Sequence, residues 1–133
     1  MEIKYGSNKI GDNGIYISPL QAFKPPKVTF TDIKSDRYYT LLMFDPDAVG
    51  GNKIHWLIVN YKKKESGNCI FSYVGPNPPK GTGIHHYYFL LIKQKRPVHL
   101  IALQDRQMSI LELFKILGLD DSTIKDRKYF TSS

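Results

Sequence analysis

Two nearly continuous runs of apolar residues constrain the fold of this chain more than any other feature. They are Tyr38–Phe44 and His86–Ile92, and neither run alternates cleanly between apolar and polar positions. A strand with one solvated face alternates, whereas a strand covered on both faces is apolar almost throughout. The two runs therefore predict central strands of a sheet that is packed on both sides.

Shorter β-rich runs elsewhere are separated by Gly, Pro, Asn and Asp residues, a pattern typical of a mainly-β domain. The further predicted strands are Gly14–Ser18, Lys27–Phe30, His55–Tyr61, Cys69–Val74 and Val98–Leu103. Cys69 begins one of these strands, and because free cysteine is usually buried, we expect it to be a small core residue. It is the single cysteine of the chain and forms no internal disulfide.

One helix is predicted near the carboxyl end. Ser109 and Glu112 have the spacing of a capping box, and Gly118 is placed to end the helix. An apolar stripe at helical spacing lies between them, formed by Ile110, Leu113, Phe114 and Leu117. The polar residues from Asp120 onward are expected to form a loosely held tail or a short second helix. Strands followed by one or two helices favour a β-sandwich with peripheral helices.

Length and charge restrict the class of protein. With 133 residues, the chain is expected to form a single domain, residues 1–133. The amino terminus lacks the apolar segment of a signal peptide, and no run approaches the ~18 apolar residues of a membrane span, so a cytoplasmic protein is expected. The net charge of +7 favours acidic partners. The lysine cluster Lys62–Lys64 is interpreted as a solvated turn.

The segment Asp45-Pro46-Asp47-Ala48-Val49-Gly50-Gly51 directly follows an apolar strand. Pro46 fixes its own backbone angle φ and biases Asp45 toward extended geometry, so the strand must end in a rigid turn. If this turn stays near-extended, the carboxylates of Asp45 and Asp47 point to the same side. They are candidate site residues, although two aspartates that cap the N–H groups of a turn explain the pattern equally well.

A second unusual segment, residues 73–87, reads YVGPNPPKGTGIHHY. It contains three prolines and three glycines between positions 75 and 83, so it cannot form regular structure. Long loops in compact domains are usually functional or disordered, and the apolar strands that bracket this loop argue against disorder. Its glycines can expose backbone N–H groups to an anion. It is not a nucleotide P-loop, because the spacing differs and no helix follows.

His55 and His85 each begin the strand that follows one of these two segments. Two histidines at the starts of central strands can converge at one end of a sheet. Taken singly, a histidine in such a place is more often structural, but the parallel placement beside two unusual loops favours a shared site. Each imidazole can donate a ring N–H to a phosphate-like anion.

In this order, the residues resemble the two signature regions of the phosphatidylethanolamine-binding proteins, a family that includes the Raf kinase inhibitor proteins. The resemblance is carried by Asp45-Pro46-Asp47-Ala48, by His55-Trp56 and by the segment from Gly75 to Tyr87. The short interval between Asp47 and His55 is similar to that of the compact bacterial and archaeal members. The resemblance implies a PEBP-like β-sandwich, in which a central antiparallel sheet packs on a smaller one. It also implies a small cavity for phosphate, sulfate, acetate or a phospholipid head group.

By position, the resemblance assigns a ligand-binding set to this chain. Within it, His55, His85 and Tyr87 are expected to donate hydrogen bonds to the anion, while the aspartates orient the imidazoles and the loop. The full set is Asp45, Asp47, His55, Gly75, Asn77, Pro78, Pro79, His85 and Tyr87. The sequence departs from the family pattern at Val49, Lys53, Ile54, Asn77 and Leu111.

The resemblance implies a non-enzymatic protein that binds an anion or a phospholipid head group and needs no metal or cofactor. It further implies a regulatory role through a protein kinase or protease partner, with peripheral contact to an anionic membrane. Two alternatives stay open. The aspartates and histidines are also ligand types for the metal of a hydrolase. The positive charge and many tyrosines suggest nucleic-acid binding, but the aromatic residues lie within strand runs, so no nucleic-acid partner is expected.

Overall fold

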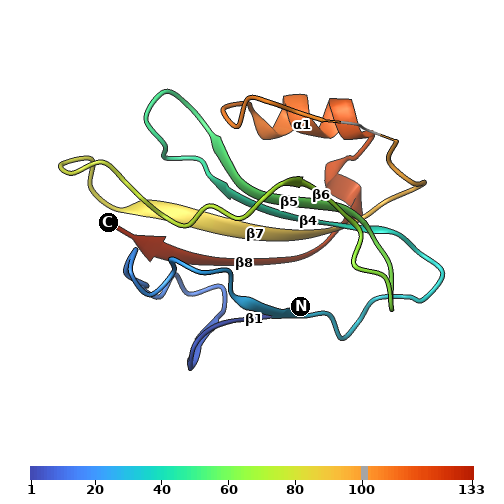
Figure 1. Cartoon of the computed structure of the whole chain (residues 1–133), viewed down its shortest axis with the longest axis horizontal. Coiled ribbons are helices and arrows are strands. Elements are labelled where there is room, and N and C mark those ends of the chain that lie inside the picture. Colours follow the sequence, from blue (N-terminus) through green and yellow to red (C-terminus); the bar gives the residue numbers. More distant parts are fainter. Residues whose placement is uncertain (100–101) are drawn as a thin grey trace.

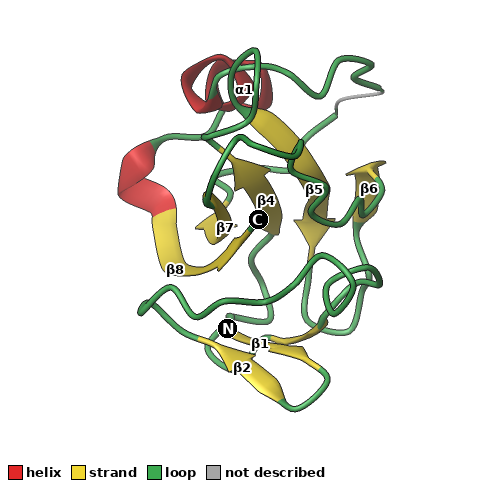
Figure 2. Ribbon diagram, turned by 90° about the vertical axis from the view of Figure 1, so that its left-hand side faces the viewer, coloured by secondary structure: helices red, strands yellow, loops and turns green. Residues whose placement is uncertain are grey.

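The computed structural model describes residues 1–99 and 102–133, which form two antiparallel sheets and one α-helix. The larger sheet contains, in spatial order, β6 (Asn68–Phe71), β5 (Lys53–Tyr61), β4 (Tyr39–Asp45), β7 (His85–Lys93) and β8 (Ile124–Ser132). The smaller sheet contains β2 (Asn8–Ile10), β1 (Glu2–Tyr5) and β3 (Lys27–Thr29). The small sheet covers one face of the large sheet, and helix α1 (Ile110–Leu117) covers the other (Figures 1 and 2). The predicted mainly-β sandwich is therefore confirmed.

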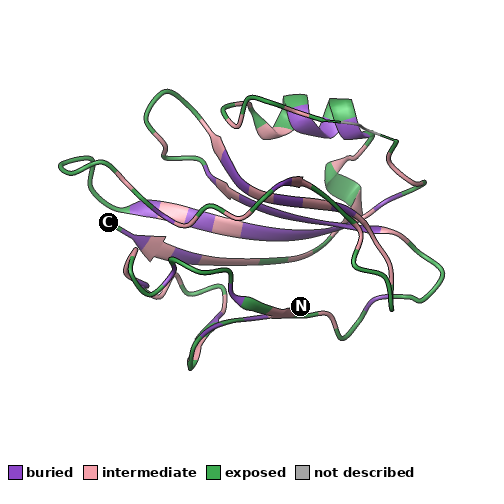
Figure 3. Ribbon diagram, in the orientation of Figure 1, coloured by how far each residue is buried: buried purple, intermediate pink, exposed green. Residues whose placement is uncertain are grey.

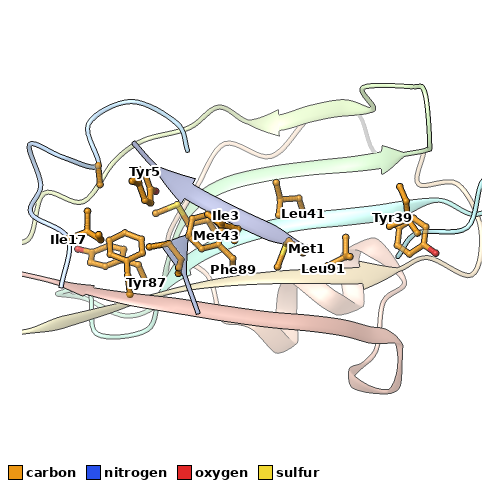
Figure 4. Packing of buried hydrophobic residues seen from close by; sticks show 14 residues of the cluster. Met1, Ile3, Tyr5, Ile17, Tyr39, Leu41, Met43, Tyr87, Phe89 and Leu91 are labelled. Carbon is orange, nitrogen blue, oxygen red and sulfur yellow. The ribbon is translucent and has the colours of Figure 1, made fainter. Parts of the chain in front are cut away.

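The central strands β4 and β7 are packed on both faces, as their continuous apolar sequences predict. Their register places Met43 beside Phe89 and Leu42 beside Leu90, so each neighbouring pair points to the same side. Met43 and Phe89 belong to the core cluster that includes β1 of the small sheet (Figure 4). Leu42 and Leu90 belong to the cluster beneath α1. The absence of polar alternation in these strands thus follows from two apolar layers.

Helix α1 begins and ends where its caps predict. The Ser109 side chain accepts a hydrogen bond from the Glu112 N–H (3.0 Å), and Gly118 adopts the left-handed conformation with φ of 70°. The buried residues are Leu113, Phe114 and Leu117, which pack in one cluster with Leu42 and Leu90 of the sheet. Figure 3 shows the buried part of the helix facing the sheet. The apolar stripe is therefore a core-packing face.

The carboxyl end differs from the prediction of a loose tail. Only Asp121–Thr123 forms a short 3-10 helix, and the following residues form β8, the edge strand of the large sheet. Strand β8 pairs with β7 from His85 opposite Ser132 to Ile92 opposite Ile124. Charged residues are common on edge strands because they discourage pairing with other chains. The four charged residues between positions 125 and 128 are therefore the reason that the sequence pattern did not predict this strand.

Several other expectations also require correction. The hairpin of β1 and β2 was not predicted, and Gly14–Ser18 contributes only an isolated bridge between Tyr16 and Thr131. Of the predicted strand Val98–Leu103, residues 100 and 101 lie outside the described residues, and the others form no strand.

Cys69 is exposed rather than buried, because β6 lies at the edge of the large sheet. Lys62–Lys64 lies in a turn, as expected.

Within residues 1–99 and 102–133, no helix combines the length and the apolar character needed to cross a membrane.

Candidate anion-binding cavity

A cavity of about 240 Å³ lies at one end of the large sheet. Its wall is formed by Asp45, Ala48, Val49, Lys53, His55, Asn77, Pro78, Pro79, His85, Tyr87 and Gln107. Seven of these residues belong to the set predicted from the sequence. The two segments singled out there, the β4–β5 connection and the β6–β7 connection, lie at this same end of the sheet (Figure 1).

Sheet topology explains why the two segments meet. Strands β4 and β7 are antiparallel neighbours, so the end of β4 at Asp45 lies beside the start of β7 at His85. Strand β5 begins on the other side of β4, with Lys53 opposite Asp45. His55 follows two residues later on β5. The predicted convergence of both histidines at one sheet end is therefore present.

The Asp45 carboxylate holds His85 in place. Its Oδ2 accepts a hydrogen bond from Nδ1 of His85 at 2.7 Å, and its Oδ1 accepts one from the Asp47 N–H at 2.8 Å. Asp45 is 2% exposed and His85 is 1% exposed, so the pair is shielded from water. Asp45 thus fixes both the imidazole and the turn that follows β4.

The second ring nitrogen of His85 is also occupied. Its Nε2 lies 2.8 Å from the Thr82 hydroxyl, which donates to the Pro79 carbonyl at 2.7 Å. Thr82 therefore links the His85 ring to the loop that precedes β7. His85 was expected to present a free ring N–H to the cavity, and instead Thr82 contacts its Nε2. Thr82 was not predicted as a contact of His85, although it lies only three residues before His85 in the sequence.

His55 presents a different face to the cavity. Its Nδ1 donates to the Val74 carbonyl at 2.6 Å, which leaves Nε2 as the ring nitrogen that a ligand can reach. Burial lowers the pKa of His55 below its ordinary value of 6.5, although the bond to Val74 opposes this effect; nearby Lys53 lowers it further. At neutral pH, Nε2 of His55 is therefore an unprotonated acceptor.

Tyr87 keeps its hydroxyl proton. Burial, followed by the charge of Asp45, raises the pKa of the phenol well above its usual value. The ring meets His55 edge-on at 5.2 Å and stacks on Phe130 at 5.2 Å, which fixes its orientation. Tyr87 is thus a rigid, protonated residue of the wall.

Two predicted site residues, Asp47 and Gly75, lie outside the cavity wall. Asp47 accepts hydrogen bonds from the backbone N–H and from Nδ1 of His86, at 2.8 and 2.7 Å. Partial burial alone would raise the pKa of Asp47, but the bonds from His86 lower it. A Cβ on Gly75 would lie 2.6 Å from the Ala22 carbonyl oxygen, so glycine is required for close packing there. Both residues hold the surrounding loops rather than face the cavity.

Other wall residues were not predicted as ligands. Lys53, noted in the sequence only as a departure from the family pattern, brings a positive charge to the wall. Gln107 comes from the segment before α1 and donates to the Val49 carbonyl at 2.7 Å. Nothing in the sequence marks Gln107, because its place depends on long-range pairing between Ile54 and Arg106.

Among the described residues, no group of three or more His, Cys, Asp or Glu side chains is placed to hold a metal ion. The fold and the cavity together define a two-sheet protein with one small polar hollow at a sheet end. The sequence matches the model of the phosphatidylethanolamine-binding protein family over residues 4–126, and the chain belongs to this family.

Solved structures show the same fold. A carboxypeptidase Y inhibitor, solved in complex with its cognate proteinase, is 20% identical, with a TM-score of 0.80 over 99% of this chain and 81% of that chain. A Plasmodium vivax phosphatidylethanolamine-binding protein is 23% identical, with a TM-score of 0.79 over 98% and 83%. The Escherichia coli protein YbcL is 17% identical, with a TM-score of 0.53 over 99% and 97%.

Proposed function

We propose that the cavity binds a phosphate-like anion, either free or as a phospholipid head group, and that the chain is a non-enzymatic binding protein. The observation that carries this proposal is the convergence of Lys53, His55, His85 and Tyr87 on one cavity. Its volume of about 240 Å³ is below the ~300–1,000 Å³ typical of drug-sized ligands. A small ion or head group suits this volume better than a large substrate.

The donors of the site follow from the geometry. Lys53 supplies a positive charge, and the protonated hydroxyl of Tyr87 can donate a hydrogen bond. In the loop part of the wall, Pro78 and Pro79 have no backbone N–H, so Asn77 is the donor there. His85 donates to a ligand only after Thr82 moves off its Nε2. Gly81 and Gly83, both with positive φ, flank Thr82 and permit that movement.

His55 makes anion binding depend on pH. Because its Nδ1–H is committed to Val74, His55 can donate to an anion only by taking a second proton on Nε2. Its pKa is lowered in the free protein, and a bound anion raises it again. Anion binding is then coupled to proton uptake by His55, so the affinity increases as the pH falls.

Sulfate is the probe for this coupling, because it stays a dianion throughout the range in which histidine titrates. Between about pH 7.5 and pH 6, we expect sulfate affinity to rise by up to about tenfold per pH unit. Calorimetry in two buffers with different ionisation heats should show uptake of up to about one proton per bound sulfate. Circular dichroism at each pH verifies that the fold is intact.

The variant His55→Gln is expected to lose this pH dependence. The matched control is His99→Gln, which alters a histidine that is exposed and distant in sequence from the cavity segments. Sulfate binding that is independent of pH in the unaltered chain, or equally affected by both variants, would contradict the role of His55. Undetectable binding at millimolar sulfate would contradict the proposed function itself.

For the protein partner, we propose a protease. The support is the fold shared over nearly the whole chain with a carboxypeptidase Y inhibitor that was solved with its cognate proteinase. Inhibition of a carboxypeptidase by the purified chain is the expected result, and no inhibition at a large molar excess would reject this partner class. A kinase partner and contact with an anionic membrane stay predictions from the sequence resemblance.

No specific observation favours the two alternative functions. A metal-dependent hydrolase lacks a metal-ligand group among the described residues. Nucleic-acid binding through base stacking needs accessible rings along a positively charged groove. The strand residues Tyr39, Tyr87 and Phe89 are buried in the core, while Tyr16 and Phe23 are exposed.

A further inference from the structure

A group of cationic side chains lies at the other end of the large sheet. We define the basic cluster as Lys34, Arg37, Lys93 and Lys125. Strand β7 begins at His85 in the cavity wall and ends at Lys93, so about 26 Å of strand separates the two places. The basic cluster is therefore distinct from the proposed anion cavity, and ligand binding at the cluster does not require that the cavity bind a ligand.

The fold fixes Lys34 and Arg37 next to the end of β7. The Arg37 N–H donates to the Lys34 carbonyl at 3.3 Å and closes a turn before β4. The Lys34 N–H donates to the hydroxyl of buried Tyr39 at 3.0 Å, which anchors this turn to the core. Tyr39 pairs directly with Lys93 between β4 and β7. Three of the four cations are thus held around one sheet corner.

Lys125 joins them through an irregularity in β8. In the β7–β8 pair, Leu91 lies opposite Asp126 and Ile92 lies opposite Ile124, so Lys125 is the extra residue of a β-bulge. A bulge redirects the side chain of its extra residue and often lies beside a functional site. Here it brings Lys125 into the walls of the hollows that Lys93 also lines.

Two hollows meet at the basic cluster. The larger, of about 400 Å³, is lined by Arg37, Lys93, Gln94, Lys95, Thr123 and Lys125, and has no acidic residue in its wall. The smaller, of about 270 Å³, includes Lys34, Lys93 and Lys125, together with Asp32 and Asp126. An anion is therefore favoured in the larger hollow, where Arg37, Lys93 and Lys125 face it, while Lys95 in the same wall pairs with Asp120 at 2.9 Å.

The positive charge of the cluster is poorly neutralised. Among the described residues, Lys34, Lys93 and Lys125 form no salt bridge, while Arg37 contacts Asp36 at 3.6 Å. Desolvation, followed by repulsion from Lys34, Arg37 and Lys125, lowers the pKa of the Lys93 ammonium group. A bound anion relieves this repulsion, so the cluster is suited to hold negative charge.

We propose that the basic cluster is a second anion site, which binds a compact small molecule carrying two or more phosphate groups. Its cations come from the turn before β4, the end of β7 and the start of β8. Several cations around one hollow balance the charge of a ligand with two phosphate groups better than that of a single phosphate. The concave shape favours a small ligand over an extended nucleic acid, which is held along a groove or stripe.

The test is a titration of the ¹⁵N-labelled full chain with pyrophosphate at constant ionic strength, followed by NMR. The backbone N–H signals of Gln94 and Asp126 report on the cluster, and that of Ala48 reports on the cavity. The double variant Lys93→Gln/Lys125→Gln is expected to weaken pyrophosphate binding at the cluster at least about tenfold. The control Lys24→Gln/Lys63→Gln removes the same charge from exposed positions elsewhere, and its expected change is below about twofold.

Tighter binding of pyrophosphate than of orthophosphate at Gln94 and Asp126 would support the proposal. Equal weakening in both double variants would overturn it, because the attraction would then reflect net charge alone. Pyrophosphate shifts confined to the Ala48 side of the molecule would also overturn it. So would cluster-dependent binding of single-stranded RNA without binding of pyrophosphate.

Discussion

Replacement of Asp45 by alanine is expected to lower the free energy of unfolding by about 3–5 kcal/mol. The reason is that Asp45 accepts hydrogen bonds from Nδ1 of His85 and from the Asp47 N–H, in a place where water cannot replace it. Removal of one partner leaves a buried imidazole without its acceptor, which costs far more than the pair contributes when intact. Urea unfolding of both proteins at about pH 7.5 measures the difference.

The chain contains its own control for this experiment. Asp47 and His86 form a second pair with the same separation of 2.7 Å, but both side chains are about 40% exposed. Exposed pairs contribute about 0–1 kcal/mol. Asp47→Ala should therefore change the free energy of unfolding little, apart from any effect on the turn that contains Asp47. Equal losses in the two variants would contradict the view that burial makes the Asp45–His85 pair important.

Replacement of Phe130 by alanine is expected to cost about 3–5 kcal/mol of stability. The Phe130 side chain is 0% exposed and lies between Tyr5 of the small sheet and Tyr87 of the large sheet, with ring centroids 5.3 and 5.2 Å away. The variant leaves a cavity between the two sheets and removes support from the Tyr87 ring. We therefore also expect weaker sulfate binding, since Tyr87 lines the cavity.

The control for Phe130 is Phe23→Ala, because Phe23 is 73% exposed. Its expected effect on stability lies within about 0.5 kcal/mol. Thermal unfolding of the three proteins checks both values. If Phe130→Ala unfolded at the same temperature as the unaltered chain, β8 would not be part of the sandwich.

The sequence allowed prediction of the elements whose burial dominates their composition. Strands β4 and β7 carry the two apolar layers in their residues, and α1 carries its stripe and both caps. The edge strand β8 could not be found in this way, because charged residues line its exposed side. The prediction that Cys69 is buried was wrong for a related reason, because apolar neighbours do not reveal that a strand lies at the edge of a sheet.

The candidate site shows the same limit. Proline, glycine and histidine in two segments were sufficient to predict that His55 and His85 converge at one sheet end, and the family resemblance predicted the cavity that they share with Asp45. The partners of individual atoms were not predictable, because they depend on side-chain directions fixed by long-range packing. Thr82 occupies a His85 nitrogen, and Asp47 turns toward His86 instead of the cavity. Lys53 and Gln107 enter the wall through the bridge between them.

The most direct test of the cavity as an anion site is a sulfate titration of the ¹⁵N-labelled chain, observed by NMR at about pH 6. The structure predicts saturable shifts of the backbone N–H signals of Ala48, Lys53 and Asn77, which line the cavity, and of Thr82, which contacts the His85 ring. Those shifts should be absent in Lys53→Met. No saturable shift at these residues, or shifts only at the far end of β7, would contradict the account.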